Sequence, residues 1–213
     1  GVDVLTLTAT PIPRTLQQSL VGFKDISVII TPPETRKPII TSVKYFDWQL
    51  VFSRIEFELS RSGQIYFLDN NISKIPSAVD RISKRFPSSR VAGASGKMNS
   101  KELENVVLAF FHGGIDILVC TTIIESGLDV TNANSIIIRD AQNLGLAQLY
   151  QIRGRVGRGD RQAYCHLLIP NKPIEKSAFR RLKSLEKNTA LGSGYNISME
   201  DLEIRGAGSI FGN

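Results

Sequence analysis

The stretch Asp116-Ile117-Leu118-Val119-Cys120-Thr121-Thr122 decides the fold that we expect for this chain. Its apolar part has the length of a buried strand and is far shorter than the ~20 residues that a membrane-spanning helix needs. Two hydroxyl residues follow at once, which is typical of a strand that ends in a turn. Helices cover both faces of a parallel sheet, so its strands are buried on both sides and are apolar throughout. A short apolar run of this kind is therefore typical of a strand in a parallel sheet.

Comparable apolar runs recur before and after this stretch, and segments with apolar residues three and four positions apart separate them. The runs that we expect to be strands are Ile39–Phe46, Gln64–Leu68, Arg90–Ala94, Asp116–Cys120, Ser135–Ile138 and Ala163–Ile169. The segments that we expect to be helices are Trp48–Arg61, Ile72–Phe86, Ser100–Phe111, Leu146–Val156 and, after the last strand, Ile174–Leu191. Such alternation favours right-handed crossovers. We therefore predict an α/β fold with a doubly wound parallel sheet and a C-terminal helical and loop extension.

The polar, proline-rich stretch at residues 31–38 predicts a linker between two domains. Residues 1–30 are then expected to be the trailing part of a domain that is mostly missing, because the chain starts inside the strand-like segment Val4–Thr10. Residues 39–170 contain the whole alternation and form the predicted α/β domain. Residues 171–213 hold a charged helical stretch and a glycine-rich tail, and we expect them to form the extension.

The composition bounds the class of protein. With 42% hydrophobic and 22% charged residues, the 213-residue chain is typical of a globular protein. Its formal charge of +6 favours a polyanionic partner, although many proteins with this balance bind no nucleic acid. Cys120 and Cys165 each lie in an apolar run, which predicts reduced core residues of a cytosolic protein. His112 and His166 lie apart from other metal ligands, so no metal site is expected.

The strongest functional pattern is the string Gln151-Ile152-Arg153-Gly154-Arg155-Val156-Gly157-Arg158. Three arginines within six residues do not form a comfortable apolar packing surface. Guanidinium groups bind oxyanions through paired hydrogen bonds, and an arginine beside a transferring phosphoryl group neutralises the charge that develops there. The alternative is the solvated basic end of a helix, which an isolated Arg-Gly-Arg would favour. The full string favours phosphate chemistry.

The second pattern, Thr121–Val130, follows the expected strand Asp116–Cys120. Open α/β sheets bind ligands beyond the carboxyl ends of their strands, and hydroxyl and backbone N–H groups at such a turn can hold a nucleic-acid phosphate. Gly127 permits close approach, and Asp129 can accept a hydrogen bond from a ribose hydroxyl. Taken alone, the Thr-Thr pair is also a good helix cap. Its coupling to the arginine string favours a binding site.

The third pattern is Leu5–Arg14, an apolar strand that ends in the hydroxyl-rich turn around Thr8 and Thr10. The residues themselves indicate only that something is bound or bridged there. A capped strand end explains them equally well.

Together these patterns resemble the conserved motifs of superfamily-two helicases. In the order and spacing of that family, the chain has Gly63–Asn71 at the place of motif IV and matches motifs III, V and VI with Thr8-Ala9-Thr10, Thr121–Val130 and Gln151–Arg158. Over essentially all 213 residues the chain is most similar to the bacterial transcription-repair coupling factors. The usual motifs of that family closely resemble the sequences of Ile123–Gly127 and Asp201–Gly208. The RecG-type branch-migrating helicases are close relatives of that family, and they share with this chain the segment Thr8–Arg14 and the arginine string.

The resemblance implies a RecA-like domain and assigns roles to single residues. Arg155 and Arg158 would be arginine fingers facing ATP, with Gln151 beside them. The other implied positions are Gly127 and Asp129 at the nucleotide cleft, Thr121 and Thr122 at a DNA phosphate, and Thr8, Thr10 and Arg205 in the coupling of hydrolysis to translocation. The parent protein would use ATP and Mg²⁺ and would bind double-stranded DNA.

The function implied is that of half an ATP-dependent double-stranded-DNA translocase. The parent would work in the cytoplasm and couple transcription to repair by displacing stalled RNA polymerase. It would contact RNA polymerase and excision-repair proteins through its other domains, with no membrane involved. Two alternatives stay open: a RecG-type helicase domain, and a non-catalytic RecA-like module that binds nucleic acid. The presence of both Arg155 and Arg158 disfavours the second alternative.

The sequence departs from the family pattern at several places. It contains no G-x-x-x-x-G-K-[ST] loop and no acidic Mg²⁺-holding motif, so we expect the first motor domain to be missing and the chain alone to be inactive. Ser95 stands where the family usually has histidine, and Thr131 replaces a usual proline. The tail stops at Asn213, before a glutamine-bearing loop that would complete the translocation motif.

Overall fold

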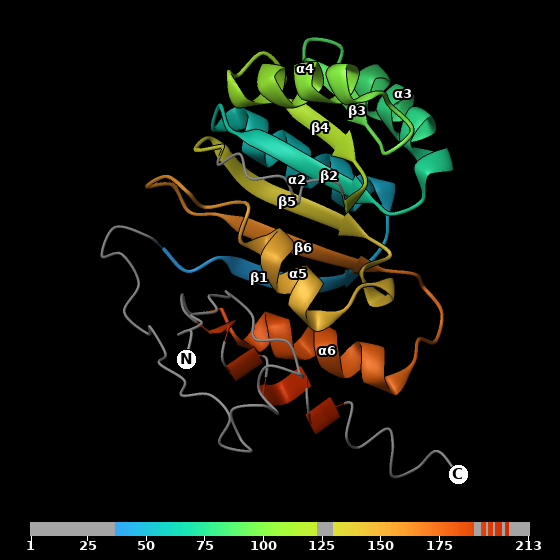
Figure 1. Cartoon of the computed structure of the whole chain (residues 1–213), viewed down its shortest axis with the longest axis vertical. Coiled ribbons are helices and arrows are strands. Elements are labelled where there is room, and N and C mark those ends of the chain that lie inside the picture. The colour runs from blue at the N-terminus through green and yellow to red at the C-terminus, as the bar shows by residue number, and fades with distance from the viewer. Residues whose placement is uncertain are drawn as a thin grey trace, which may run out of the picture.

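Six parallel strands form a single sheet in the computed structural model, which describes residues 37–122, 130–189, 193, 194, 196, 197, 199–201, 203 and 204. The strands are β1 (Ile40–Tyr45), β2 (Gln64–Asp69), β3 (Val91–Ala94), β4 (Ile117–Cys120), β5 (Ala133–Arg139) and β6 (Tyr164–Ile169). Their order across the sheet is β1-β6-β5-β2-β4-β3, and every neighbouring pair is parallel (Figure 1). The predicted doubly wound parallel sheet is confirmed.

Helices cover both faces of this sheet. They are α2 (Trp48–Ser60), α3 (Ile75–Arg85), α4 (Ser100–Phe111), α5 (Leu146–Arg153) and α6 (Lys176–Lys187), with short 3-10 turns η1 (Ile72–Lys74) and η3 (Ala141–Asn143). In Figure 1, α4 and α5 lie in front of the sheet, α2 and α3 lie behind it, and α6 runs beside the edge strand β1. Each crossover returns the chain to a parallel strand, as right-handed βαβ units require.

Two apolar cores, one on each face, hold the layers together. Behind the sheet, Ile55 of α2 and Ile82 of α3 belong to one buried cluster that also contains Ile137 of β5. In front of it, Phe110 of α4 and Leu149 of α5 are equally buried. Helices occupy both faces of the sheet. Functional groups can therefore be presented by the loops at its two edges, where the strands begin and where they end.

Two expected helices have different bounds in the structure. The segment Ile72–Phe86 divides into η1 and α3, since Pro76 has no N–H and stands in the first turn of α3. The segment Leu146–Val156 is helical only to Arg153. Gly154 follows as the C-cap, and Gly157 has a φ of 72°, a left-handed conformation that glycine adopts without strain. Half of the arginine string is therefore a loop.

The first helix of the predicted extension, α6, packs directly on the α/β domain. Leu182 and Leu185 are buried in the front core. Glu186 Oε1 accepts a hydrogen bond of 2.8 Å from the backbone N–H of Val43, which lies on the edge strand β1. Burial alone would raise the pKa of Glu186, but the hydrogen bonds from Lys183 and Val43 outweigh it and hold this pKa below its ordinary value. The helix thus covers an edge that would otherwise offer unpaired backbone groups.

Both cysteines lie in the core. Cys120 and Cys165 are free and buried, as expected of core thiols, and burial raises the pKa of Cys165 to about 12.

The expected domain boundaries are not tested by the structure. Residues 1–30 and most of the expected linker 31–38 lie outside the described residues, so these boundaries stay a prediction. Within the described residues, no helix combines the length and the apolar character that crossing a membrane requires.

One buried histidine makes the stability of the fold depend on pH. His166 of β6 is 8% exposed, and its Nδ1 lies 3.2 Å from the Oγ of Ser42. Burial and the nearby charge of Arg54 lower the pKa of His166 to about 4, from an ordinary value of 6.5. Between these two values the unfolded chain binds a proton that the folded chain does not. The free energy of unfolding therefore decreases as the pH falls from 6.5 towards 4.

We predict that His166→Gln removes this part of the pH dependence, which amounts to about 2–3 kcal/mol between pH 7 and pH 4.5. Urea unfolding at the two pH values measures it. The matched control is His112→Gln, since His112 is exposed and its replacement should leave the dependence as in the wild type. Equal pH dependence in the His166→Gln variant and the wild type would contradict the assignment.

Candidate functional site

The described site residues divide between two opposite edges of the sheet. All strands end at the right of Figure 1, which we term the carboxyl edge, and begin at the opposite, amino edge. Leu68 pairs with both Cys120 and Ile138, so the end of β4 is level with the end of β5. The backbone N–H of Gly157 donates to the carbonyl of Ala133, the first residue of β5. The arginine string thus lies ~17 Å along the strands from the turn after β4.

Residues 154–163, which we call the arginine loop, join α5 to β6 at the amino edge. Val156 is fully buried and anchors the loop in the front core. A Cβ atom at the left-handed Gly157 would lie 3.0 Å from the Cβ of Ala163 and 3.4 Å from Cγ1 of Ile39. Glycine is therefore required here for packing within the chain. The nearest neighbours of Gly157 are thus side chains of the domain itself.

The expected catalytic side chains lie on the outer side of this region. Gln151 and Arg158 are exposed, and Arg155 is half-buried. The buried side chain of Val156 and the hydrogen bond from Gly157 to Ala133 hold the loop that carries the two arginines. Guanidinium groups at the surface of a fixed loop are suited to bind an oxyanion.

The remaining arginine of the string, Arg153, has a different position. It is 3% exposed, and its Nη1 donates to the carbonyl of Leu185 at 2.9 Å and to Oγ1 of Thr41 at 3.3 Å. Arg153 therefore ties α5 to α6 and β1. The spacing that could have revealed this is the apolar stripe of α5, because Arg153 directly follows Ile152 and lies four positions after Leu149.

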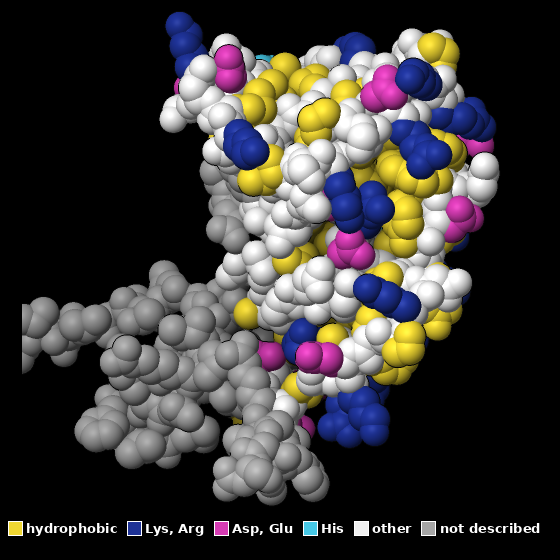
Figure 2. Space-filling view, turned by 90° about the vertical axis from the view of Figure 1, so that its right-hand side faces the viewer, with side chains coloured by type: hydrophobic (Ala, Val, Ile, Leu, Met, Phe, Trp, Pro, Cys, Tyr) yellow, Lys and Arg dark blue, Asp and Glu magenta, His cyan; other side chains and the backbone are white. Residues whose placement is uncertain are grey.

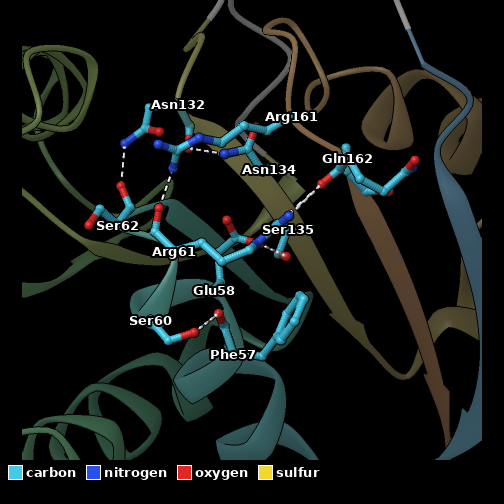
Figure 3. Close-up of polar contacts among 11 residues, drawn as sticks. Phe57, Glu58, Ser60, Arg61, Ser62, Asn132, Asn134, Ser135, Arg161 and Gln162 are labelled. Atoms are coloured by element: carbon cyan, nitrogen blue, oxygen red, sulfur yellow. Dashed lines mark hydrogen bonds and ion pairs between the residues drawn. The ribbon is translucent and has the colours of Figure 1, made fainter.

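A buried polar network holds the amino edge beside the arginine loop (Figure 3). Glu58, in the last turn of α2, is fully buried and accepts hydrogen bonds of 2.5 Å from Ser135 Oγ and from Arg61 Nη2. Both Nη atoms of Arg61 also donate to the carbonyl of Gln162 at 3.1 Å. The side chain of Gln162 donates in turn to the carbonyl of Pro38 at 2.7 Å. One carboxylate thus connects α2, β5, the end of the arginine loop and the segment before β1.

The turn after α2 completes this network. A Cβ atom at Gly63 would lie 1.9 Å from Oε1 of Glu58, so only glycine fits over the carboxylate. Asn132 Nδ2 donates to the carbonyl of Ser62 at 2.9 Å, and the guanidinium of Arg161 donates to the carbonyl of Arg61 (Figure 3). These bonds join the start of β5 and the start of β6 to the same turn.

Several expected site residues lie outside the described part of the chain. They are Thr8, Thr10, Gly127, Asp129 and Arg205. Thr131, two positions after Asp129, lies at the amino edge, since its carbonyl would be 3.1 Å from a Cβ atom at Gly159. Among the described residues, no three His, Cys, Asp or Glu side chains are grouped as a metal site requires.

The carboxyl edge presents hydroxyl and amide groups at the end of β4. Thr122 is half-buried, and its Oγ1 donates to Oδ1 of the exposed Asn70 at 3.3 Å. Thr121 is 5% exposed, and its backbone N–H donates to the carbonyl of Ala94 at 3.2 Å. Of the two expected phosphate-binding threonines, Thr122 is therefore the one whose side chain reaches the surface.

Charged side chains of both signs lie on this edge. Figure 2 views the molecule from the carboxyl edge and shows Lys and Arg side chains spread across the face, with Asp and Glu side chains between them. Asp69, at the end of β2, is 1% exposed and accepts from Arg139 at 3.3 Å and from the N–H of Asn71 at 2.9 Å. Its negative charge is thus neutralised inside the edge.

Comparison with known proteins gives the relatives of this chain. Residues 49–160 match the family described as "Helicase conserved C-terminal domain". The chain is 51% identical over all 213 residues to the transcription-repair-coupling factor of Bacillus subtilis (strain 168), and 49% identical to that of Staphylococcus aureus (strain USA300). It spans 18% of the length of each of these proteins.

Solved structures show the same fold. A structure of RecG bound to a three-way DNA junction matches with a TM-score of 0.77 and 35% identity, over 94% of this chain and 27% of that chain. The Mycobacterium smegmatis helicase Lhr, bound to single-stranded DNA and AMP-PNP, matches with a TM-score of 0.62 at 16% identity. That match covers 85% of this chain and 26% of the other, and it supports the fold alone.

We predict that Glu58→Gln destabilises the domain by about 2–3 kcal/mol, because it leaves Arg61 without its buried counter-charge. The loss is smaller than for a fully buried pair, since the Arg61 side chain is 24% exposed. Urea unfolding measures the difference. The control is Glu56→Gln on the exposed side of the same helix, which should change stability by less than about 0.5 kcal/mol. Similar losses for both variants would show that the network does not hold the amino edge.

Proposed function

Because this chain belongs to the family of helicase conserved C-terminal domains, we propose that it is one half of an ATP-driven motor that moves along double-stranded DNA. The observation that carries the proposal is the division of the site. Arg155 and Arg158 stand on a loop at the amino edge, and Thr122 stands beside the amide of Asn70 at the carboxyl edge. An ATP-driven DNA motor needs separate binding sites for the nucleotide and for the DNA, and the two edges of the sheet can supply them.

On the nucleotide side, the chain would contribute charge and no phosphate cradle. Arg155 and Arg158 would face the phosphates of ATP, with Gln151 beside them and with Gly127 and Asp129 at the nucleotide cleft. ATP and Mg²⁺ supply the phosphoryl chemistry when bound. The guanidinium groups would stabilise the negative charge that develops during transfer. The phosphate-binding loop and the Mg²⁺ ligands would lie on another domain of the parent, so this chain alone would not hydrolyse ATP.

On the DNA side, the side chain of Thr122 would hold a phosphate of the duplex, with the buried Thr121 directly before it. Hydroxyl and basic groups contact the backbone and read no base edges, so binding would be weak, independent of sequence and strongly dependent on salt. The coupling of hydrolysis to movement would involve Thr8, Thr10 and Arg205. The extension that starts with α6 would act as part of this coupling.

The parent protein would use this motor in the cytoplasm to displace stalled RNA polymerase and so couple transcription to DNA repair. The coupling-factor relatives, with 51% and 49% identity across the whole chain, support this role. RNA polymerase and excision-repair proteins would bind other domains. Residues 1–30 would belong to the first motor domain, 31–38 to the linker, 39–170 to this domain, and 171–213 to the translocation extension.

A RecG-type helicase is the second candidate. The high structural similarity to RecG over 94% of the chain favours it, while the lower identity of 35% favours the coupling factors. Both candidates share the division between nucleotide and DNA edges.

We predict that Arg158→Ala in the intact parent lowers kcat for ATP hydrolysis by about 10³-fold and leaves nucleotide affinity nearly unchanged. The arginine is proposed to act on the charge of the transition state, so its loss should appear in kcat. Arg158→Lys should not restore the rate, since lysine lacks the planar guanidinium fork.

Steady-state kinetics at saturating DNA, together with equilibrium binding of a non-hydrolysable nucleotide, tests this prediction. The control is Arg85→Ala, because Arg85 is an exposed arginine in the last turn of α3, outside the arginine loop and its network, and its loss should leave kcat as in the wild type. If Arg158→Ala keeps most of kcat, Arg158 is structural and the proposed role of the arginine loop is wrong.

A further inference from the structure

A pocket opens at the carboxyl edge, between the end of β1 and the beginning of α6, away from both candidate sites. Its volume is about 600 Å³. The lining side chains that matter here are Tyr45, Lys172, Ile174, Lys176, Phe179 and Arg180. Tyr45 comes from β1, and the other five come from the segment 172–180, which starts the predicted extension. The pocket thus exists only because α6 packs beside β1.

The charge of this pocket is positive and uncompensated among the described residues. Lys172, Lys176 and Arg180 are exposed, and no described Asp or Glu side chain lies within ion-pair distance of them. The described residues that line the pocket include no Asp or Glu. Glu175, the nearest acid in the sequence, accepts from Ser177 Oγ at 3.2 Å. Other basic residues of the domain do have partners, and Lys84 with Asp80 and Arg90 with Asp116 are two such pairs.

Two aromatic rings stand beside these cations. Tyr45 is 60% exposed and Phe179 is 44% exposed, whereas most large apolar side chains of the described residues are buried. Ile174 also lines the pocket and packs, partly buried, against the front core. A simple inorganic anion would leave both rings in water. A chain of phosphodiesters offers phosphates to the cations and sugar surfaces to the rings, so nucleic acid matches both features.

The position of the pocket relates it to the rest of the DNA track. β1 and β4 are separated by four inter-strand spacings in the order of the sheet, which corresponds to ~19 Å along the carboxyl edge. A DNA duplex rises 3.4 Å per base pair, so ~19 Å corresponds to about 6 base pairs. A duplex that lies along this edge and touches Thr122 would therefore also reach the pocket.

We infer that this pocket is a second phosphate-binding subsite for the double-stranded DNA that the carboxyl edge holds. The inference rests on the proposed function. It gives α6 a direct role: the extension that packs on the motor domain also contacts the track, about 6 base pairs from the contact at β4. Lys176 and Arg180 are one helical turn apart and lie on the same side of α6, so they would bind neighbouring phosphates.

The test is the binding of a labelled 30-base-pair duplex to this chain, measured by fluorescence anisotropy at several salt concentrations. The variant is Lys176→Gln with Arg180→Gln. The control is Lys84→Gln with Lys187→Gln. It removes the same charge from two exposed residues in the C-terminal turns of α3 and α6, away from the pocket at the beginning of α6. Urea unfolding verifies that both variants fold like the wild type.

We expect the pocket variant to bind at least 10-fold more weakly at low salt, and its slope of log K against log salt to decrease by about 2, since each lost phosphate contact removes ~0.9. The control should keep the wild-type slope. Equal behaviour of the two variants, as for a pocket that receives an acidic protein segment, would overturn the inference while wild-type binding still supports the DNA track. Absence of salt-dependent duplex binding by the wild type would overturn the track and the pocket together.

Discussion

The parallel direction of all six strands is the constraint on which the rest of this domain depends. It gathers every strand end at one edge and every strand start at the other, and helices cover both faces in between. Functional groups can then appear only at the two edges. The arginine loop stands at the amino edge, and Thr122 stands at the carboxyl edge. The strands, and helices such as α5, connect the two edges directly.

Each edge is held by buried polar contacts as well as by the apolar cores. At the amino edge, the carboxylate of Glu58 connects Ser135 and Arg61, and through Arg61 it reaches the end of the arginine loop. At the side of the sheet, Arg153 and Glu186 fasten α6 to α5 and β1. Removing one partner of such a contact leaves a polar group unsatisfied, which costs more than an exposed ion pair contributes. The position of the arginine loop therefore depends on residues that make no contact with nucleotide or DNA.

The sequence predicted the fold well because apolar runs and helical periods report burial directly. All six strands and all five helices appear near their expected positions. The pattern failed where a residue type had two uses. Arg153 belongs to the arginine string but lies in the core, where it binds the carbonyl of Leu185. The pocket was not predictable, since Tyr45 and α6 are about 130 positions apart and meet only through the sheet order. The roles of Gly127 and Asp129 stay predictions.

The central claim is that the two edges have different partners, with DNA at the carboxyl edge. Nuclear magnetic resonance of the 23.5 kDa chain tests it most directly, because each backbone amide reports its own surroundings during a titration with duplex DNA. The account predicts that the signals of Asn70, Thr122 and Lys176 shift with a common affinity that weakens in salt, while those of Asn132 and Gly157 stay in place. Shifts concentrated in the arginine loop, with the carboxyl edge unchanged, would contradict it.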